Sequence, residues 1–443
     1  MDVILSGVGR PRPVAALAIL MLSVTACAGN APAAPTGQAL YVGVDLPLTG
    51  AEAGSALPAL NGVRFFVQTH PTLDGFTVSL KTADDAAGGV PDPNRGAGNV
   101  RAFLADPSVV AMIGPFDAAV ARLEIPLANA AGLAMVTPAT SNPCLTRDVF
   151  TPAPLNPART AISCKAAGLP SAAELRPAHT NNFFRLTTTD DLQGAAAAEY
   201  AFHKLHLIRT AVITDHEAYG QGLGYAFSAR FTGLGGTVVG HFDLGPKSRD
   251  ATAFLTSARD AGAQAVFYGG DTRPGGCEIR AEMRALFPAG EATPFLGGDG
   301  IAEDPACVAA AGANSAGIFA TVPIADADSA PGAAATIRDF KKTFGRTSDY
   351  GHYTLLAYDA MAVLYAALDR AIQGSGNTLP ARATVTGELA QTSGLVGATG
   401  TLGFDGAGDT TNRVVSIFEA VASDPWAPWK LVDTVDYSAK LPY

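Results

Sequence analysis

The sequence predicts an α/β protein whose parallel sheets are covered by helices on both faces. Short apolar runs rich in valine and isoleucine alternate with helical patterns almost to the C-terminus, and this alternation is typical of βαβ units. The rhythm runs once over residues 40–136 and restarts over residues 192–296. We therefore expect two similar, doubly wound lobes.

The first lobe is expected to contain four strands and three helices. Alternating apolar and β-branched residues predict the strands, and apolar residues at helical spacing, such as Val63 and Val67, predict the helices. The expected strands are Leu40–Leu46, Phe76–Lys81, Val109–Ile113 and Ala134–Val136, and the expected helices are Gly62–Thr69, Asn94–Leu104 and Val120–Ala130.

The second lobe repeats the pattern. Its expected helices are Leu192–Leu205, Gln221–Leu234, Ala251–Ala261 and Glu278–Leu286, and its expected strands are Ala211–Thr214, Thr237–Phe242, Ala265–Tyr268 and Pro294–Leu296. Two further helices are expected at Ala333–Phe344 and Tyr353–Ile372. The last hundred or so residues carry too few strands for a domain of their own, so we expect them to return and complete both lobes.

The first thirty residues have the features of a secretory leader. Arg10 and Arg12 precede an apolar run, Val14–Leu22, which is shorter than the roughly 20 residues that a membrane span needs. Val24-Thr25-Ala26-Cys27 resembles the lipobox of bacterial lipoproteins. The resemblance implies a signal peptide at 1–26, a lipid on Cys27 and a lipidated tether at 27–37; the alternative is a secreted protein with an incidental cysteine.

The remaining four cysteines indicate disulfides, because such bonds persist outside the cytoplasm. Four cysteines allow three pairings, which sequence alone does not separate. We prefer the pairing with the shortest loops, Cys144–Cys164 and Cys277–Cys307. Cys144 and Cys164 lie in a proline-rich stretch, Ser141–Thr180. This stretch is long for a loop, and we expect it to be an insertion that is held together by a disulfide. No metal site is expected, because no CxxC or comparable histidine spacing occurs.

Composition excludes several classes of protein. The chain has 443 residues, of which 48% are hydrophobic and 16% charged, so it can bury substantial cores. A net charge of −10 and the lack of a basic stripe argue against nucleic acid as a partner. Signatures of a nucleophile elbow, a P-loop and a zinc protease are absent, and no cofactor is expected.

Two further motifs have ordinary explanations. Gly220-Gln221-Gly222-Leu223-Gly224 lacks the spacing of a dinucleotide site and is better explained as a helix N-terminus. Asp84-Asp85 ends the second expected strand, where the pair is expected to cap a turn or a helix rather than to catalyse or bind a metal.

The junctions after the strands resemble those of a known family over residues 40 to about 420. The family is that of type I periplasmic substrate-binding proteins of ABC importers, of the branched-chain amino acid-binding type. The matching motifs are Val42–Gly50 followed by Asn61-Gly62, Val110–Pro115, Thr137–Pro143, Phe184–Thr187, Tyr219–Gly222, Phe267–Gly270, Phe295–Gly300 and Tyr353–Ala360.

The resemblance implies two lobes that are joined by three hinge crossovers and close on a solute. We place the crossovers near Leu186, Thr321 and Thr392. The N-terminal lobe would then comprise residues 38–185 plus 322–392, and the C-terminal lobe residues 186–321 plus 393–443.

Transferring the family's pocket position by position gives a partial match. The ligand-binding positions that it implies are Ser55, Phe116, Asp117, Ala118, Thr140, Ser141, Tyr219, Asp271 and Asp299. Ser55 replaces the family's aromatic wall, and Ala118 replaces the serine that grips a ligand carboxylate. Amides at 116–119 could still hold an anion, although Asp117 puts a negative charge nearby unless it turns away as an N-cap.

In the second lobe, Asp299 occupies the position that binds the ligand's ammonium group. Asp271 stands where the family often has tyrosine. Two carboxylates favour a cationic or amine-bearing ligand, although Asp271 could instead cap the helix near Cys277 and Asp299 could support a turn. An amino acid is the leading class; amides, polyamines and small aromatics remain alternatives.

Three functional classes follow. The first is a monomeric, lipid-anchored solute-binding protein that passes its ligand to the permease and ATPase of an ABC importer. The second is a ligand sensor on the same fold. The third is an extracellular hydrolase, for which the matched loops supply neither a nucleophile–base pair nor a metal.

Overall fold

The structure is a computed structural model of the chain. It describes residues 37–50, 52–151, 162–245, 250–271, 275–287, 293–302, 307–308, 311–326, 329–330, 332–421 and 429–443. The predicted signal peptide, Cys27 and all of the predicted tether except Gly37 lie outside these residues.

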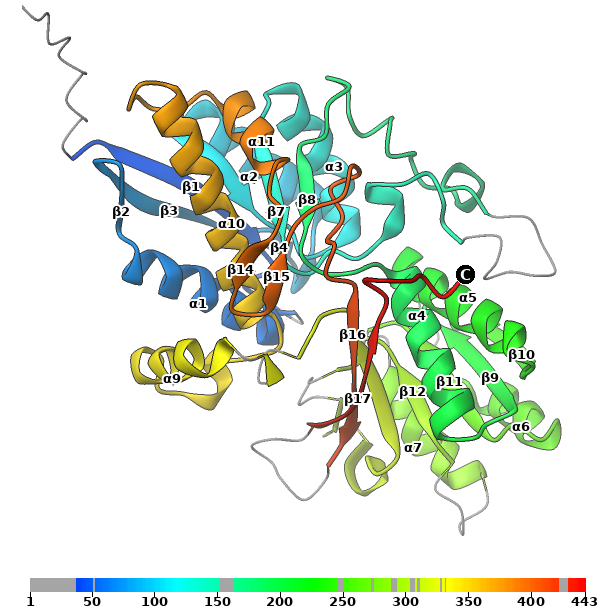
Figure 1. The fold of residues 1–443 in the computed structure, drawn as a ribbon. Coiled ribbons are helices and arrows are strands. Elements are labelled where there is room, and N and C mark those ends of the chain that lie inside the picture. The colour runs from blue at the N-terminus through cyan, green and yellow to red at the C-terminus, as the bar shows by residue number, and fades with distance from the viewer. Residues whose placement is uncertain are drawn as a thin grey trace, which may run out of the picture. The chain divides into compact units, whose positions relative to one another are not determined.

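The first sheet has the strand order β2-β3-β1-β6-β7-β8 (Figure 1). All neighbours in it are parallel except β2, which is antiparallel to β3. The strands are β1 (Ala39–Leu46), β2 (Thr72–Leu73), β3 (Phe76–Asp84), β6 (Val109–Ile113), β7 (Ala134–Thr137) and β8 (Phe183–Arg185). Because the chain steps from β1 to β3 on one side and then returns to β6 on the other, the strand order reverses between β1 and β6.

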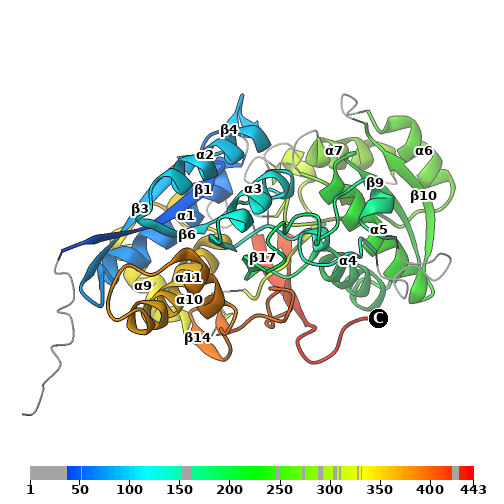
Figure 2. The same ribbon diagram turned by 90° about the horizontal axis from the view of Figure 1, so that it is seen from above.

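Helices cover both faces of this sheet, as Figure 2 shows. On one face, three helices pack together: α1 (Ala53–Thr69), α10 (Tyr353–Gly374) and α11 (Arg382–Leu389). On the other face, α2 (Pro93–Ala105) packs on α3 (Ala118–Ala130). Every residue of β6 is buried, as expected for a parallel strand covered on both sides. Short pairs β4 (Ala86–Ala87) with β5 (Val90–Pro91) and β14 (Leu395–Gly397) with β15 (Gly400–Leu402) lie outside the sheet.

The second sheet has the order β10-β9-β11-β12-β13-β16-β17. Its strands are β9 (Arg209–Thr214), β10 (Thr237–Asp243), β11 (Ala265–Gly269), β12 (Phe295–Gly297), β13 (Ile318–Val322), β16 (Val414–Ala420) and β17 (Trp429–Asp436). The strand order reverses between β9 and β11. The first five strands are parallel, whereas β16 and β17 are antiparallel, a feature that the sequence pattern did not predict.

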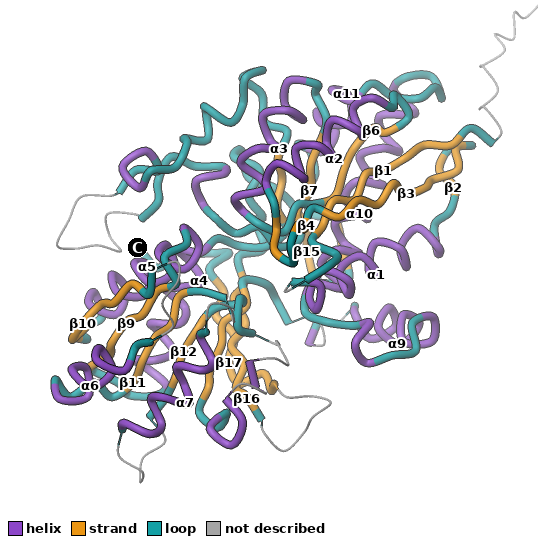
Figure 3. The backbone as a smooth tube through the Cα atoms, turned by 180° about the vertical axis from the view of Figure 1, so that it is seen from behind, coloured by secondary structure: helices purple, strands orange, loops and turns teal. Residues whose placement is uncertain are grey.

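Helices again cover this sheet on both faces (Figure 3). The helices α4 (Asp190–Glu199) and α5 (Ala218–Gly233) pack together, as do α6 (Thr252–Asp260) and α7 (Gly276–Leu286). A π-helical turn, Tyr200–Lys204, extends α4, and α9 (Ala333–Thr343) packs on α1. The glycine-rich motif at 220–224 lies within α5, as predicted. The two-lobe α/β fold predicted from the sequence is therefore confirmed.

The start of α1 differs most from the prediction. The helix begins at Ala53 and not at Gly62, and it contains both Pro58 and Gly62, residues that usually weaken a helix. Gly62 has a packing reason, since a Cβ there would collide with the carbonyl oxygen of Thr354 in α10. Contact between α1 and α10 thus overrides the local propensity.

Three crossovers connect the sheets and hydrogen-bond to one another. After β8, the Thr188 amide donates to the carbonyl of Pro323, which follows β13, at 2.8 Å. The Ser416 hydroxyl in β16 donates to the Ile324 carbonyl at 2.8 Å. The Arg185 amide donates to the carbonyl of Gly408, which precedes β16, at 3.0 Å.

The third crossover lies later than predicted. The Ala398 and Thr399 amides donate to Asp359 of α10 at 2.8 and 2.7 Å, and Phe404 packs on Phe184 of β8. Residues 395–404 therefore belong with the first sheet. The chain then joins the second sheet at β16, so these contacts favour a lobe boundary after residue 404 over the predicted one at 392/393.

A buried ion pair fixes the junction of the first and third crossovers. Arg185 Nε lies 2.7 Å from Asp409, and Arg147 Nε lies 2.9 Å from the other Asp409 oxygen. The Arg185 guanidinium also donates to the Thr146 hydroxyl at 2.6 Å and to the Thr140 and Asn142 carbonyls. Arg185 is fully buried, so these partners replace the water that it loses.

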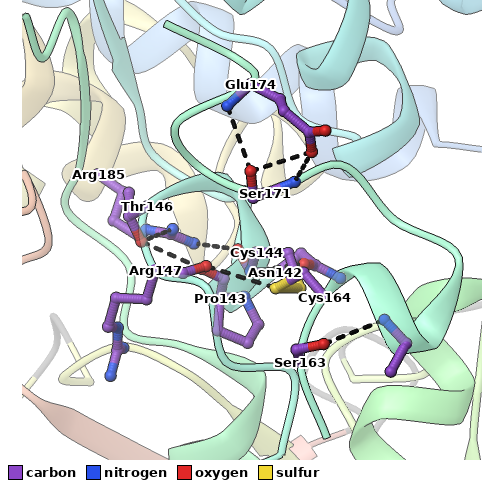
Figure 4. Close-up of a disulfide and its surroundings, with 11 residues drawn as sticks. Asn142, Pro143, Cys144, Thr146, Arg147, Ser163, Cys164, Ser171, Glu174 and Arg185 are labelled. Atoms are coloured by element: carbon purple, nitrogen blue, oxygen red, sulfur yellow. Dashed lines mark hydrogen bonds between the residues drawn. A yellow bond between two sulfur atoms is a disulfide. The ribbon is translucent and has the colours of Figure 1, made fainter. Parts of the chain in front are cut away.

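The loop between β7 and β8 carries the first cysteine pair. Cys144 and Cys164 are paired with their Cα atoms 5.6 Å apart, next to Thr146 and the arginine cluster (Figure 4). Cys277 and Cys307 are also paired, with their Cα atoms 5.1 Å apart. Both pairs are the predicted ones and have the spacing that a disulfide requires; the bonds themselves stay a prediction.

Within the described residues, no helix is long and apolar enough to cross a membrane.

Candidate functional site

Polar side chains from both lobes follow the carboxyl ends of parallel strands on either side of the two points where strand order reverses. In the first lobe, Glu52 follows β1 and Asp117 follows β6. In the second, Tyr219 follows β9 and Asp271 follows β11. Ligands of doubly wound sheets bind at such switch points.

Asp299 is the best-connected of these groups. It follows β12, and one of its oxygens accepts hydrogen bonds from Gln193 Nε2 at 2.8 Å and from the Tyr219 hydroxyl at 2.6 Å. Its other oxygen accepts from the hydroxyl of Tyr353, at the start of α10, at 2.6 Å. Asp299 therefore links elements of both lobes and does far more than support a turn.

Tyr219 is held as a hydrogen-bond donor. Burial, followed by the negative charges of Asp299 and Asp271, keeps its pKa well above the usual range. Its hydroxyl also accepts from the Gly300 amide at 3.1 Å. A Cβ on Gly298 would lie 2.5 Å from this hydroxyl, so the glycine gives Tyr219 the space to reach Asp299.

Asp271 does not cap a helix. The α7 helix begins at Gly276, and its N-cap is Gly275, with no side-chain cap. The Asp271 amide donates to Asp215 at 3.2 Å, and a Cβ on Gly300 would collide with the Asp271 carboxylate. The capping alternative is thus wrong, and Asp271 lies against the loop that carries Asp299.

Asp117 is the N-cap of the helix α3. One carboxylate oxygen accepts from the Ala119 and Val120 amides at 2.7 and 3.0 Å and so caps α3. Ala118 is the first residue of α3. The alternative that Asp117 acts as an N-cap is therefore confirmed, whereas the binding of an anionic group by amides at 116–119 stays a prediction.

The two hydroxyl residues after β7 have different surroundings. The buried Thr140 hydroxyl donates to the Pro115 and Phe116 carbonyls at 2.6 and 2.8 Å, so it fixes that loop and has no hydrogen left for a ligand. Ser141 accepts the Asp190 amide on its carbonyl at 3.1 Å, and its hydroxyl lies beside the Asp190 carboxylate.

The remaining predicted positions lie at the first lobe's edge. Phe116 packs edge-on against Tyr353 with ring centroids 5.3 Å apart. Ser55 lies exposed in the first turn of α1. At that corner, the side chain that is electrostatically close to Asp117 and Asp299 is Glu52.

The carboxyl groups around Asp299 repel one another. Burial, and then Asp117 and Asp299, raise the pKa of Glu52 to about 8. Burial, and then Glu52 and three aspartates, raise the pKa of Asp271 well above its usual range. Burial is also the main reason that the pKa of Asp190 is raised to about 7, with Asp299 adding to it. A positively charged ligand group would best offset the repulsion between these carboxyl groups.

Sequence reasoning missed Glu52, Asp190, Gln193 and Tyr353. Asp190 and Gln193 follow the Phe184–Thr187 motif directly, and Tyr353 opens the Tyr353–Ala360 motif, so their positions were available. Their roles were not, because the contacts with Asp299 join segments up to 106 residues apart.

The Asp84-Asp85 pair was predicted to cap a turn or a helix. Asp84 does accept backbone amides, whereas the side chain of Asp85 does not. Asp84 accepts the Leu48 and Ala86 amides at 2.9 and 3.0 Å. Asp85 is fully buried, and neither of its oxygens has a hydrogen-bond partner. Among the described residues, no group of three or more His, Cys, Asp or Glu side chains is placed to hold a metal.

Two doubly wound sheets, three mutually bonded crossovers and polar groups from both lobes at the strand ends define a two-lobe α/β binding protein. The chain belongs to the family of periplasmic binding proteins, whose model matches residues 39–424. This confirms the resemblance found in the sequence; members of the family bind solutes outside the cytoplasm and are not enzymes.

Relatives and solved structures agree with this assignment. The chain is 28% identical over 383 residues to the Leu/Ile/Val-binding protein homolog 3 of Brucella melitensis. The aligned region covers 86% of this chain and 91% of that protein. A leucine-binding protein, LivK, from Thermotoga maritima has a TM-score of 0.71 at 24% identity, over 89% of this chain and 98% of that one. A solute-binding protein from R. palustris in complex with 4-hydroxybenzoate has a TM-score of 0.70 at 16% identity, over 92% and 98%.

Proposed function

We propose that this protein captures an amine-bearing solute between its lobes and delivers it to the permease and ATPase of an ABC importer. An amino acid or a close relative of one is the leading ligand class. The relatives named as Leu/Ile/Val-binding proteins support this class. The lipid on Cys27 would hold the protein at the membrane surface, and the protein is proposed to act as a monomer.

The observation that carries the proposal is the environment of Asp299. Three neutral donors, from Gln193, Tyr219 and Tyr353, converge on its two oxygens. A carboxylate has about four acceptor positions, so one on the Tyr353-bonded oxygen remains for an ammonium group. Because Tyr353 belongs to the first lobe, a ligand bound there would be held where the lobes meet.

A binding assay with a charge-neutral variant tests the proposal. Breaking a buried ammonium–carboxylate pair from one side costs roughly 3–5 kcal/mol, so Asp299→Ala should weaken binding more than a hundredfold, at ~1.4 kcal/mol per tenfold. Asp243→Ala is the matched control, since Asp243 is exposed and bonds only to the side chains of His216 and Gln221 among its described hydrogen bonds.

The ligand class comes from a thermal-shift screen of amino acids, amides, polyamines and aromatic acids, since a ligand of the folded form raises the melting temperature. Shifts with carboxylates that lack an amine, and with nothing else, would contradict the amine-bearing class. Loss of labelled-ligand uptake in a strain without the gene would support the importer; unchanged uptake would favour the sensor.

A further inference from the structure

We propose, resting on the solute-binding function above, that the ligand is a small dication with two amine groups and no free carboxylate. An aliphatic diamine is the simplest member of this class. Three observations carry this inference: the charges that surround the site, the donors that are already used, and one buried carboxylate without an ion-pair partner of its own.

Carboxyl groups come to the site from both lobes. Glu52 and Asp117 belong to the first lobe, and Asp190, Asp271 and Asp299 to the second. They act on one another as like charges: Glu52 with Asp117 and Asp299, Asp271 with Glu52, Asp117 and Asp299. None of the ion pairs found among the described residues involves Glu52 or Asp271.

A zwitterion brings no net charge to such a site. An amino acid would offset one carboxylate with its ammonium group and add a carboxylate of its own. A dication offsets two carboxylates, one from each lobe, and adds none. Because opposite charges stabilise ionised carboxyl groups, the dication is the better complement.

Asp190 provides an independent sign of a missing cationic partner. It is 2% exposed, and neither of its oxygens makes a hydrogen bond of good geometry. It lies beside the Ser141 hydroxyl and is close enough to Asp299 to feel its charge. Buried polar groups are nearly always paired. The nearest cation, Arg185, is already bonded to Asp409.

A ligand carboxylate finds few donors in the first lobe. Asp117 caps the amides at the start of α3, and the Thr140 hydroxyl donates to backbone carbonyls. Ala118 stands where the family's carboxylate-binding serine is expected. Two amides of this helix start and the Thr140 hydroxyl are therefore already used, and the serine is missing.

Calorimetry on the mature protein with matched probes tests the inference. The probes are 1,4-diaminobutane and 1,5-diaminopentane (two amines), L-leucinamide (one amine, no carboxylate) and L-leucine (one amine, one carboxylate). A diamine should bind at least tenfold more tightly than leucinamide, and leucinamide more tightly than leucine.

The outcomes separate this inference from the proposed function. Tighter binding of leucine than of both diamines overturns the dication and leaves the amine-bearing function standing. Benzoate is included as a carboxylate without an amine, and binding of benzoate alone, or of no probe, overturns both.

Two variants examine the residues that carry the argument. Asp190→Asn should weaken diamine binding at least tenfold while leaving the ligand-free melting temperature equal or higher, because it removes an unpaired buried charge. A residue with only a structural role would lower that temperature. Asp271→Asn tests the same idea at a less buried position, and Asp243→Asn is the control. Unchanged diamine affinity in both site variants overturns the inference.

The pH dependence supplies a second readout. The groups that face Glu52 and Asp190 are the hydroxyl of Ser141, the bonded Arg185 and five acidic neighbours: Asp85, Asp117, Asp191, Asp271 and Asp299. Both carboxyl groups carry protons at low pH and lose them near neutrality, so diamine binding should tighten at least tenfold from pH 6 to pH 8.5. An affinity that is flat or falls over this range contradicts the inference.

Discussion

The buried ion pair at the crossovers should contribute strongly to stability. Asp409→Ala leaves the fully buried Arg185 without its carboxylate, and such one-sided loss costs about 3–5 kcal/mol. Three hydrogen bonds to Thr140, Asn142 and Thr146 remain, which favours the lower end, about 3 kcal/mol.

Urea denaturation followed by circular dichroism measures this cost. With a slope of about 3 kcal/mol per molar urea, the midpoint should fall by about 1 M. Glu388→Gln is the control, because the Arg370–Glu388 pair is partly exposed, at 41% and 33%, and such pairs contribute about 0–1 kcal/mol.

The same ion pair predicts a pH dependence. The charges of Arg185 and Arg147 outweigh burial and lower the pKa of Asp409 below its usual value. Its stabilisation is therefore present above the unfolded pKa of about 3.9 and is lost as pH falls through the lower folded value. Equal midpoints for Asp409→Ala and Glu388→Gln at pH 7, or a difference between wild type and Asp409→Ala that grows below pH 3, would refute the reasoning.

Four further outcomes are expected. Cys27→Ala should release soluble protein or leave an uncleaved precursor, and membrane-bound protein of the same processed mass would contradict the lipid anchor. Mass spectrometry of a non-reduced digest should find Cys144 linked to Cys164, whereas free thiols would contradict the bond. Gly298→Ala should weaken ligand binding at least tenfold and also lower the unfolding midpoint, since its methyl group would collide with the Tyr219 hydroxyl and with buried Leu223; unchanged affinity would show that this hydroxyl is dispensable. The ligand-free urea midpoint should fall from pH 5 to pH 8, and a midpoint that rises would contradict the acidic site.

Local pattern predicted most of the fold. The strand Val109–Ile113 was predicted with its observed bounds, and Leu40–Leu46 within one residue, because buried parallel strands are continuous apolar runs. The start of α1 and the β14–β15 hairpin were missed. Both depend on contacts with α10. In the sequence, α10 lies some 300 residues after α1, so no local window contains the two segments that make this contact.

The site was predicted by position but not by partner. The sequence placed Asp299 and Tyr219 at strand ends, and the resemblance gave them roles. It did not show that the two bond to each other, that Asp117 turns onto its own helix, or that Asp190 is buried without an ion-pair partner. Such facts depend on side-chain direction, and an aspartate before a helix has the same sequence signature whether it caps or faces a ligand.

The acidic site should cost the ligand-free protein stability as pH rises. Burial raises the pKa of Asp190 to about 7 and of Glu52 to about 8 in the site, and in the first lobe it raises the pKa of Asp45, at the end of β1, to about 6 and that of Asp85 to about 8. Between pH 4 and 8 the folded chain therefore binds more protons at these groups than the unfolded chain, whose carboxyl groups titrate near pH 4, and its stability falls with increasing pH. A cationic ligand favours the ionised form of the groups that face it, so its binding should strengthen over the range in which the empty protein weakens. The same carboxyl groups thus oppose folding and promote capture, and the ligand that restores stability is the one that carries positive charge to both lobes.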